Sequence, residues 1–249
     1  MNVVGLISGG KDSLYNLVCC SKDGHNIITL AHLIPLKKQN ETDSFMYQSA
    51  GFELIPSIAK CMEIPLIQHQ IKREPINVDD LTYTYNSNDE VEDLYELLLE
   101  AKSKFPNINA VSCGAIISNY QKNRLEHVCK RLNLHVLTYL WGKNQKELLQ
   151  NMISDGMDAI IVKIASFGLN KNHVGKTIKE IFNDLELVSE KYGLNICGEG
   201  GEYETITLDC SLYKYKIIID EYEIIQHTYD VICPVFLLKP LKWKLEKKL

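Results

Sequence analysis

The chain has 249 residues, of which 45% are hydrophobic and 24% are charged, and its formal net charge at pH 7 is −5. That length suffices for one large domain or two small ones with a buried core. The negative charge argues against a broad nucleic-acid surface, which needs uncompensated Lys and Arg, and no apolar run approaches the roughly 20 residues of a membrane span. These features predict a globular protein that binds neither nucleic acid stably nor a membrane.

The first predicted strand, residues 2–7, leads into the stretch Ser8-Gly9-Gly10-Lys11-Asp12-Ser13, after which apolar residues recur at helical spacing over about 13–22. The glycines permit a tight turn and a close approach to a ligand. The N–H groups and partial positive charge of a new helix favour an anion. Lys11 adds a full charge, and Ser8 and Ser13 add hydroxyl donors. The stretch therefore predicts a phosphate-binding loop, the alternative being a capped helix with an incidental lysine.

The spacing of this loop differs from that of a Walker A motif, G-x-x-x-x-G-K-[ST]. It resembles the PP-loop of ATP pyrophosphatases, which cut ATP between its α- and β-phosphates. That resemblance implies ATP as the bound nucleotide. Asp12 either helps to hold a metal ion or caps the helix, since Asp is a favoured helix-capping residue.

Strands and helices alternate through the first half of the chain. Further strands are expected at 27–34, 65–70, 109–113 and 134–138, and helices at 44–62, 89–104, 118–132 and 144–154. Capping boxes, Ser87-x-x-Glu90 and Asn144-x-x-Glu147, are expected to begin two of the helices. This order predicts an α/β fold with a doubly wound parallel sheet, whose ligands bind at the carboxyl ends of its strands.

The pattern changes after residue 155, with a strand expected at 158–165, a helix at 175–191 and β-rich sequence to about 238. We therefore predict a nucleotide-binding domain at 1–140 and a smaller α+β domain at 141–249. The eight cysteines form no C-x-x-C pair and have no zinc-like spacing with histidine. Reduced thiols and a cytoplasmic location are expected.

Two glycine-containing stretches of the second half need interpretation. The first imitates a Walker loop, but Asn170 stands where a glycine is needed; we expect a helix start there, which brings His173 and Lys176 toward substrate or phosphate. The second, Glu199-Gly-Gly-Glu202-Tyr203-Glu204-Thr205, holds three carboxylates that repel one another unless a cation or donors are near. It is either a solvated acidic turn or a site for Mg²⁺ or a positively charged substrate group, with Tyr203 as an aromatic wall.

Several motifs occur together in one order. They are Ser8–Ser13, Asp43-Ser-Phe-Met-Tyr-Gln48, Gly114-Ala-Ile-Ile-Ser-Asn-Tyr-Gln121 with Arg124, Tyr139-Leu-Trp141, His173-Val-Gly-Lys-Thr177, Cys197-Gly-Glu-Gly-Gly-Glu-Tyr-Glu-Thr205 and Leu208-Asp-Cys210. Over about residues 1–240 this set closely resembles the diphthine–ammonia ligase family. Two positions depart from the family pattern: Asn119 stands where relatives usually have Asp, and Phe52 where many have His, which weakens any role as a base at either position.

The resemblance implies a HUP-like fold and an enzyme that joins ammonia to the carboxylate of diphthine on elongation factor 2, through an acyl-adenylate, while ATP becomes AMP and pyrophosphate. It implies ATP and Mg²⁺ as cofactors, with elongation factor 2 and ammonium as partners. The trimethylammonium group of diphthine suits the acidic and aromatic cluster around Glu202 and Tyr203. No glutaminase segment is recognisable, so free ammonium is the simplest nitrogen source.

Site roles follow from the resemblance and from the expected strand ends. Lys11, Asp12 and Ser13 are the predicted catalytic residues, with Asp12 also as metal ligand, and replacing Lys11 with Ala is expected to lower turnover while leaving the fold intact. ATP is expected to contact Ser8, Gly9, Gly10, Lys11, Asp12, Ser13, Ala31, His32 and Gly114. Substrate is expected to contact Tyr47, Gln48, Tyr120, Gln121, Arg124, Trp141, His173, Lys176, Glu199, Glu202, Tyr203, Glu204 and Thr205.

A purely structural role is the alternative for some of these residues. Gln121 and Arg124 are either contacts of the incoming carboxylate or AMP or structural caps. Tyr47 is either a substrate contact or core, and Trp141 either packs or faces a cation. Two other functions are also open: a PP-loop enzyme that adenylates a tRNA base, and a nucleotide-binding regulator without chemistry. The basic tail at 239–249 is either solvated or a docking contact.

Overall fold

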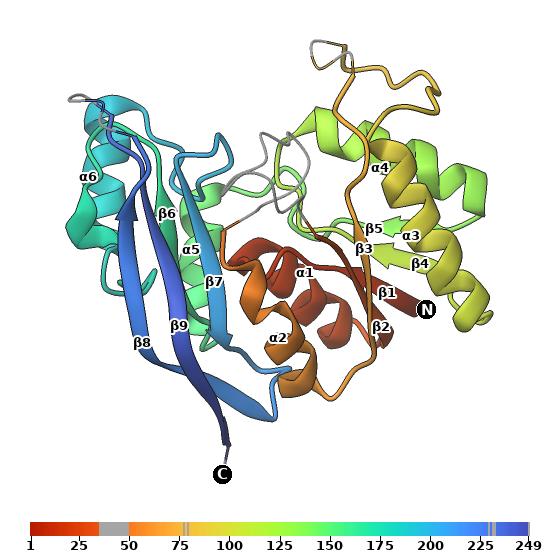
Figure 1. Ribbon diagram of the computed structural model, residues 1–249, viewed down its shortest axis with the longest axis horizontal. Helices are drawn as coiled ribbons and strands as arrows, with labels where there is room; N and C mark the ends of the chain where they lie inside the picture. The colour runs from red at the N-terminus through yellow and green to blue at the C-terminus, as the bar shows by residue number, and fades with distance from the viewer. Residues whose placement is uncertain (35–49, 77, 79, 229, 231–232, 249) are drawn as a thin grey trace. The chain divides into compact units, whose positions relative to one another are not determined.

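The computed structural model describes residues 1–34, 50–76, 78, 80–228, 230 and 233–248. Its helices and strands, labelled along the ribbon in Figure 1, form two compact units. One unit comprises Met1–Ser8, Asp12–Ser49 and Ile64–Trp141, and the other comprises Gly9–Lys11, Ala50–Glu63 and Gly142–Leu249. The second unit therefore takes in two short segments from the N-terminal half of the chain as well as the C-terminal half.

The first unit contains a five-stranded sheet in the order β3-β2-β1-β4-β5. All neighbouring strands in it are parallel, which confirms the predicted sheet. The strands are β1 (Asn2–Leu6), β2 (Asn26–Ile34), β3 (Leu66–Gln70), β4 (Ala110–Ser112) and β5 (His135–Leu137).

Helices cover both faces of this sheet. They are α1 (Lys11–Lys22), α3 (Val91–Lys104) and α4 (Asn119–Leu132). Val4 of β1 shares a buried core with Leu94 of α3 and Leu125 of α4. The next residue, Gly5, faces the other side, where a Cβ atom would lie 2.8 Å from Leu17 of α1. Because α1 packs opposite α3 and α4, the sheet is doubly wound.

Two of the predicted helix starts agree with the structure and one does not. Ser118 caps α4, since its hydroxyl accepts a hydrogen bond from the Gln121 N–H at 3.3 Å. Asn144 likewise accepts from the Glu147 N–H at 3.1 Å and begins α5. The capping box expected at Ser87 is wrong, because α3 begins four residues later, at Val91. There the buried carboxylate of Asp89 accepts from the Val91 N–H at 2.9 Å, so a neighbouring side chain takes the capping role.

The second unit contains a four-stranded antiparallel sheet in the order β7-β6-β9-β8. Its strands are β6 (Asp158–Ile164), β7 (Tyr203–Asp209), β8 (Tyr215–Gln226) and β9 (Phe236–Lys247). Its helices are α2 (Ile55–Met62), which follows a short 3₁₀ turn at Phe52–Leu54, α5 (Gln145–Ser154) and α6 (Phe182–Tyr192). The strands confirm the β-rich reading of the C-terminal half.

The helix expected at 175–191 begins only at Phe182, where α6 starts. Thr177 instead forms an antiparallel bridge with Ile160 of β6. Its N–H and hydroxyl both donate to the Glu180 carboxylate, at 2.8 and 2.9 Å. These contacts hold the segment before α6 in a turn. Of the helix expected at 44–62, residues 44–49 lie outside the described part of the chain.

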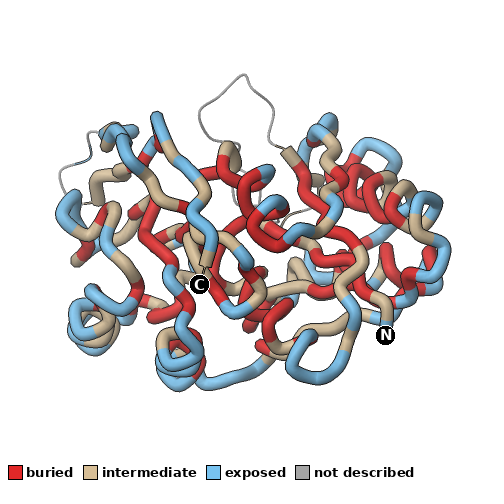
Figure 2. The backbone as a smooth tube through the Cα atoms, turned by 90° about the horizontal axis from the view of Figure 1, so that it is seen from below, coloured by how far each residue is buried: buried red, intermediate tan, exposed pale blue. Residues whose placement is uncertain are grey.

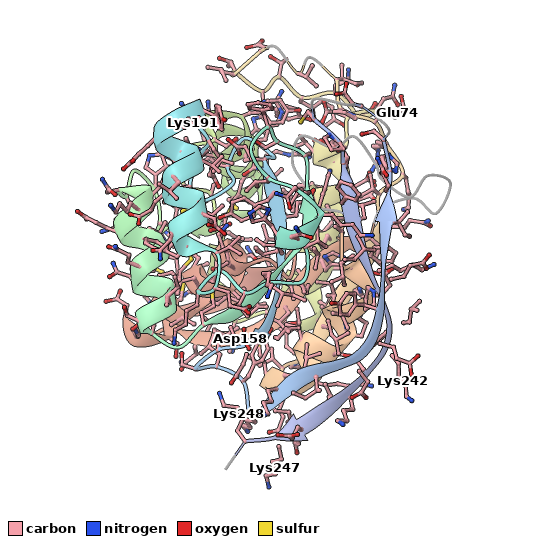
Figure 3. All side chains as sticks on the ribbon, turned by 90° about the vertical axis from the view of Figure 1, so that its left-hand side faces the viewer. Glu74, Asp158, Lys191, Lys242, Lys247 and Lys248 are labelled. Atoms are coloured by element: carbon pink, nitrogen blue, oxygen red, sulfur yellow. The ribbon has the colours of Figure 1, made fainter. Side chains whose placement is uncertain are left out.

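The basic tail is the strand β9, which pairs with β8 over almost its whole length. Lys242 and Lys247, labelled in Figure 3, lie on this ribbon. Lys242 is 3.5 Å from Glu221 and Lys244 is 3.2 Å from Asp220, while Lys248 donates to Asp209 at 2.8 Å. The charge of the tail is thus balanced by carboxylates of the same unit.

Figure 2 shows by colour how far each residue along the chain is buried. Strands β1 and β6 are largely buried, whereas β8 and β9 include long exposed stretches. Within the described residues no helix is long and apolar enough to cross a membrane. All eight cysteines lie in the described part of the chain, and no disulfide joins any of them.

Candidate functional site

The main chain of the loop is tightly packed at Gly9, in the second unit. Gly9 has a φ of +87°, and a Cβ atom there would lie 2.5 Å from Ile206 of β7 and 2.8 Å from Ile55 of α2. The N–H of Thr207 donates to the Gly9 carbonyl at 2.9 Å. Glycine is needed at this position for both its backbone conformation and its small size.

Lys11 begins α1 and is only 2% exposed. Its Nζ donates to the Cys197 carbonyl, and it lies 4.9 Å from the centroid of the Tyr203 ring. Its backbone N–H donates to the Thr205 hydroxyl at 3.0 Å. These three partners of Lys11 all lie in the stretch 197–205, for which the sequence left open a solvated acidic turn, a Mg²⁺ site and a site for a positively charged substrate group.

Two of the three clustered carboxylates bind donors of the protein. Glu202 accepts from the N–H groups of Asn195 at 3.0 Å and Gly200 at 2.8 Å. Glu204 accepts from the Ala50 N–H at 3.1 Å and lies 3.3 Å from the Lys163 ammonium. Their mutual repulsion is thus relieved by local donors, one of the two conditions that the sequence required. Binding of Glu199, Glu202 or Glu204 to substrate stays a prediction.

Tyr203 and Thr205, the other predicted substrate contacts of this stretch, are 2% exposed each. The Tyr203 hydroxyl donates to the Ile196 carbonyl at 2.7 Å, and its ring faces Lys11. In this structure the cation beside the Tyr203 ring is the Lys11 ammonium, a group of the protein itself. Direct contact of either residue with substrate stays a prediction.

Gly10 belongs to the second unit with Gly9 and Lys11, whereas Ser8, Asp12 and Ser13 lie in the first unit. The Ser13 hydroxyl accepts from the Ser8 N–H at 3.3 Å and lies 3.4 Å from the Ser8 hydroxyl. At Gly114, after β4, a Cβ atom would lie 2.5 Å from the Asp12 carbonyl carbon and 2.6 Å from the Ser13 nitrogen. Gly114 therefore admits the start of α1, which is a packing reason for glycine beside its predicted contact with ATP.

Ala31 and His32 lie at the end of β2, against the residue before the loop. The Ile7 N–H donates to the Ala31 carbonyl at 3.0 Å, and Nδ1 of His32 is 2.9 Å from the Ile7 carbonyl oxygen. His32 is 3% exposed, and its burial lowers its pKa to about 4. The neutral ring thus donates from Nδ1, and Nε2 has no hydrogen-bond partner among the described residues.

The three arginines of the chain all engage groups of the first unit. Arg131 makes a two-pronged contact with Glu92, at 2.7 and 2.9 Å, and Arg73 pairs with Asp93 and Glu96. Arg124 is 0% exposed. Its guanidinium carbon lies 3.4 Å from the Tyr120 ring centroid, and Nη1 donates to the Asp80 carbonyl at 3.2 Å. This placement gives Arg124 a packing role in the first unit, although the cap of α4 is Ser118 and not Arg124. Contact of Arg124 or Tyr120 with substrate stays a prediction.

Other predicted site residues are less concentrated. The Trp141 ring faces a cation, the Lys122 ammonium 4.2 Å from its centroid. His173 bonds to the Asn170 N–H at 3.0 Å, and Lys176 lies 3.5 Å from Glu180. A short 3₁₀ helix, Lys171–His173, starts beside His173 with Asn170 and His173 forming its capping box, whereas the α-helix expected from residue 175 begins only at Phe182. Contact of His173 or Lys176 with substrate or phosphate stays a prediction. Gln121 lies in the first turn of α4. Tyr47 and Gln48 lie outside the described residues.

A magnesium ion fits this site only in part. Within the part of the chain that the structure describes, no group of three or more His, Cys, Asp or Glu side chains is placed to hold a metal ion. Asp12 supplies one carboxylate in the first turn of α1. One or two carboxylates together with phosphate oxygens are the usual Mg²⁺ ligands at nucleotide sites. The residues therefore suit an ion that arrives with ATP.

Sequence reasoning missed several groups that shape the loop. Three groups contact the loop or residues near it: the Lys163 ammonium, the Cys197 carbonyl and the Ile206 side chain. These contacts join residues that are distant in sequence, so no local pattern predicts them. Asn16 is also new: its amide nitrogen donates to the Ser112 hydroxyl at 2.7 Å and its oxygen accepts from the Tyr139 N–H at 2.8 Å. The signal available in the sequence was a polar residue, Asn16, among the apolar residues of the predicted helix.

Comparisons with known proteins bear on the whole chain. Residues 1–136 match the model of the diphthamide synthase N-terminal domain, and residues 144–236 match that of the diphthamide synthase C-terminal domain. A solved structure described as a predicted subunit of tRNA methyltransferase, from Methanocaldococcus jannaschii, aligns over 85% of this chain and 98% of its own, at 16% identity. Its TM-score of 0.36 is too low to carry an argument.

Curated relatives are much more similar. The chain is 48% identical to diphthine–ammonia ligase of Bos taurus and 47% identical to that of Homo sapiens, in each case over 100% of this chain and 94% of the relative. It is 45% identical to diphthine–ammonia ligase of Schizosaccharomyces pombe, over 94% of this chain and 38% of that longer protein. Both halves of the chain match one family, and the relatives share its full length, so the chain belongs to the diphthamide synthase family.

Proposed function

We propose that the protein is an ATP-dependent ligase that converts the diphthine carboxylate of elongation factor 2 into the amide of diphthamide. Ammonium supplies the nitrogen, and AMP and pyrophosphate are released. The observation that carries the proposal is the 48% identity to diphthine–ammonia ligase of Bos taurus, which extends over 100% of this chain. The glycine-rich turn that enters α1 supports it, because such a turn offers N–H groups to phosphates.

The chemistry has two displacements. A carboxylate is a poor electrophile at neutral pH, so its oxygen first attacks the α-phosphorus of ATP, and the bond to pyrophosphate breaks. The lone pair of ammonia then attacks the acyl carbon of the acyl-adenylate. AMP leaves with the electrons of the carbon–oxygen bond, and the nitrogen loses a proton to solvent. Both steps develop negative charge on phosphate oxygens, which fixed donors stabilise.

The residues of the loop take the phosphate end of this reaction. We assign the hydroxyls of Ser8 and Ser13 and N–H groups of the turn that enters α1 to the phosphates. The Lys11 ammonium exchanges the Cys197 carbonyl for an oxygen of the departing pyrophosphate, a movement that its flexible side chain permits. Mg²⁺ held by Asp12 and the phosphates would neutralise part of the same charge. Ala31 and His32 are assigned to the adenine.

Other residues are assigned to the substrate end of the reaction. Gln121 and the undescribed Tyr47 and Gln48 are proposed contacts of the diphthine side chain, and Glu199 is the carboxylate we assign to its trimethylammonium group. The protein substrate acts in translation, so the reaction is proposed to occur in the cytoplasm. The absence of any disulfide among the eight cysteines fits a reducing compartment.

The test is a reconstitution with purified elongation factor 2 that carries diphthine, ¹⁵N-ammonium and ATP. We expect ¹⁵N in the factor, with one AMP and one pyrophosphate per amide. Neither product is expected when the factor is omitted or replaced by tRNA. Release of ADP, or AMP formation with tRNA in place of the factor, would overturn the proposal.

A further inference from the structure

We infer that Thr205 is a positioning residue of the phosphate-binding loop: its hydroxyl fixes the main chain of Lys11, and strand β7 thereby holds the loop in its binding conformation. The inference rests on the proposed function, because it concerns the ATP site of that reaction. It departs from the sequence prediction, which assigned Thr205 to substrate.

The contacts on residues 9–11 converge from one strand. The Thr205 hydroxyl accepts from the Lys11 N–H at 3.0 Å, and the Thr207 N–H donates to the Gly9 carbonyl at 2.9 Å. Between them, Ile206 occupies the space where a Cβ atom of Gly9 would lie, at 2.5 Å. Three successive residues of β7 thus contact residues 9–11 of the loop. All of these groups belong to the second unit.

The Thr205 hydroxyl acts as a helix cap from 194 residues away. A helix begins with N–H groups that have no partner within the helix, and a side-chain oxygen from the residue just before it usually satisfies one of them. Here that residue is Gly10, which has no side chain. Thr205 supplies the missing oxygen, and it is 2% exposed, so water does not readily replace it.

This cap decides which groups of the loop remain for ATP. With the Lys11 N–H directed at β7, the phosphates are bound by other donors of the turn and by the Lys11 ammonium. The ammonium itself lies against Cys197 and Tyr203 of the same stretch. The main chain of Lys11 is therefore held at one point while its side chain moves between the Cys197 carbonyl and a phosphate oxygen.

The test compares Thr205→Val, Thr205→Ser and Thr207→Val. Valine keeps the shape of threonine but removes the hydroxyl, whereas serine keeps the hydroxyl. Thr207 offers a matched control, because its buried hydroxyl has no hydrogen-bond partner among the described residues and only its main chain contacts the loop. Hydrogen exchange of the Lys11 amide and steady-state AMP release are measured for each variant at a temperature where unfolding curves show a fully folded protein.

We expect Thr205→Val to speed exchange of the Lys11 amide by roughly tenfold. Its kcat should fall roughly ten- to a hundredfold, since small displacements of fixed donors have such effects, while KM for ATP changes less. Thr205→Ser should restore both quantities to within about threefold of wild type, and Thr207→Val should leave both near wild type.

Equal exchange rates in Thr205→Val and wild type would overturn the inference, and so would a loss in Thr205→Ser as large as in Thr205→Val. Exchange of the Lys11 amide is read without any turnover. If wild-type protein released no AMP in the reconstitution, the proposed function would fail while the exchange comparison still decided whether β7 holds the loop.

Discussion

Replacing Lys11 with Met separates the two roles of this residue. Lys11→Ala was expected to leave the fold intact, but the buried side chain makes that expectation unsafe, because truncating a buried side chain to Ala costs about 2–5 kcal/mol of stability. Methionine fills most of the same volume. It leaves the Cys197 carbonyl without the ammonium, at a cost of about 1–3 kcal/mol, and it removes a cation–π contact worth about 2 kcal/mol.

Removing the charge also relieves the desolvation of a buried ion, which costs several kcal/mol. These opposing effects should leave the free energy of unfolding of Lys11→Met within about 2 kcal/mol of wild type. The transition state loses one fixed charged donor, worth about 2.7–4 kcal/mol, so turnover should fall about 10²- to 10³-fold. Catalysis is therefore expected to change far more than stability.

The assay pairs urea unfolding with release of AMP and pyrophosphate at saturating ATP, ammonium and diphthine-bearing factor. Lys191→Met on α6 is the matched control, since its ammonium lies on the surface, 4.9 Å from the Tyr192 ring centroid, outside the site. The control should match wild type in both measurements. Turnover of folded Lys11→Met within about threefold of wild type would refute the assignment of its ammonium to the pyrophosphate.

Three further predictions concern stability and the loop. Because burial lowers the pKa of His32 to about 4 from 6.5, the unfolded chain binds the proton more readily; stability should be complete above pH 6.5 and fall by up to about 3 kcal/mol toward pH 4. Urea midpoints at pH 7 and 5 should therefore differ less in His32→Gln than in wild type, and equal differences would contradict this. Gly114→Ala should displace the start of α1 and weaken ATP binding at least tenfold by calorimetry (roughly 1.4 kcal/mol). In Gly24→Ala no atom lies within 4 Å of the added Cβ, and the φ of +78° strains the backbone only locally, so this variant should lose stability but keep wild-type affinity. Arg131→Met leaves the 7%-exposed Glu92 side chain with the Tyr83 hydroxyl as its remaining donor among the described residues and should lower the free energy of unfolding by about 1–3 kcal/mol; a change below about 1 kcal/mol in urea titration would show that water replaces the guanidinium.

The parallel sheet was predictable because each of its strands is a short apolar run followed by a helical pattern. The end of β2 therefore fell at the expected residue, whereas β4 ends one residue and α1 begins two residues before the expected position. Helix starts were predictable where one polar side chain decides them, as at Ser118 and Asn144. They were not where a buried group decides, as with Asp89 before α3, because a sequence pattern does not say which carboxylate is buried.

The site shows the same division. The glycines of the loop and the carboxylates near Glu202 stand out as local patterns, so their positions could be read from the sequence. Their partners could not. That Glu202 binds N–H groups of its own loop, and that Thr205 caps α1, depends on strand pairings formed between distant parts of the chain.

The make-up of the second unit has a consequence for how the protein comes into being on the ribosome. Residues 9–11 emerge among the first, yet β7, which grips them, is made only after residue 203. During most of synthesis the nascent chain therefore contains the phosphate-binding loop without the strand that fixes its conformation. A proteolytic fragment that ends after β5 would retain its parallel sheet residues and still lack the strand that shapes Gly9 and Lys11. ATP binding should thus be among the last properties that a newly made molecule acquires.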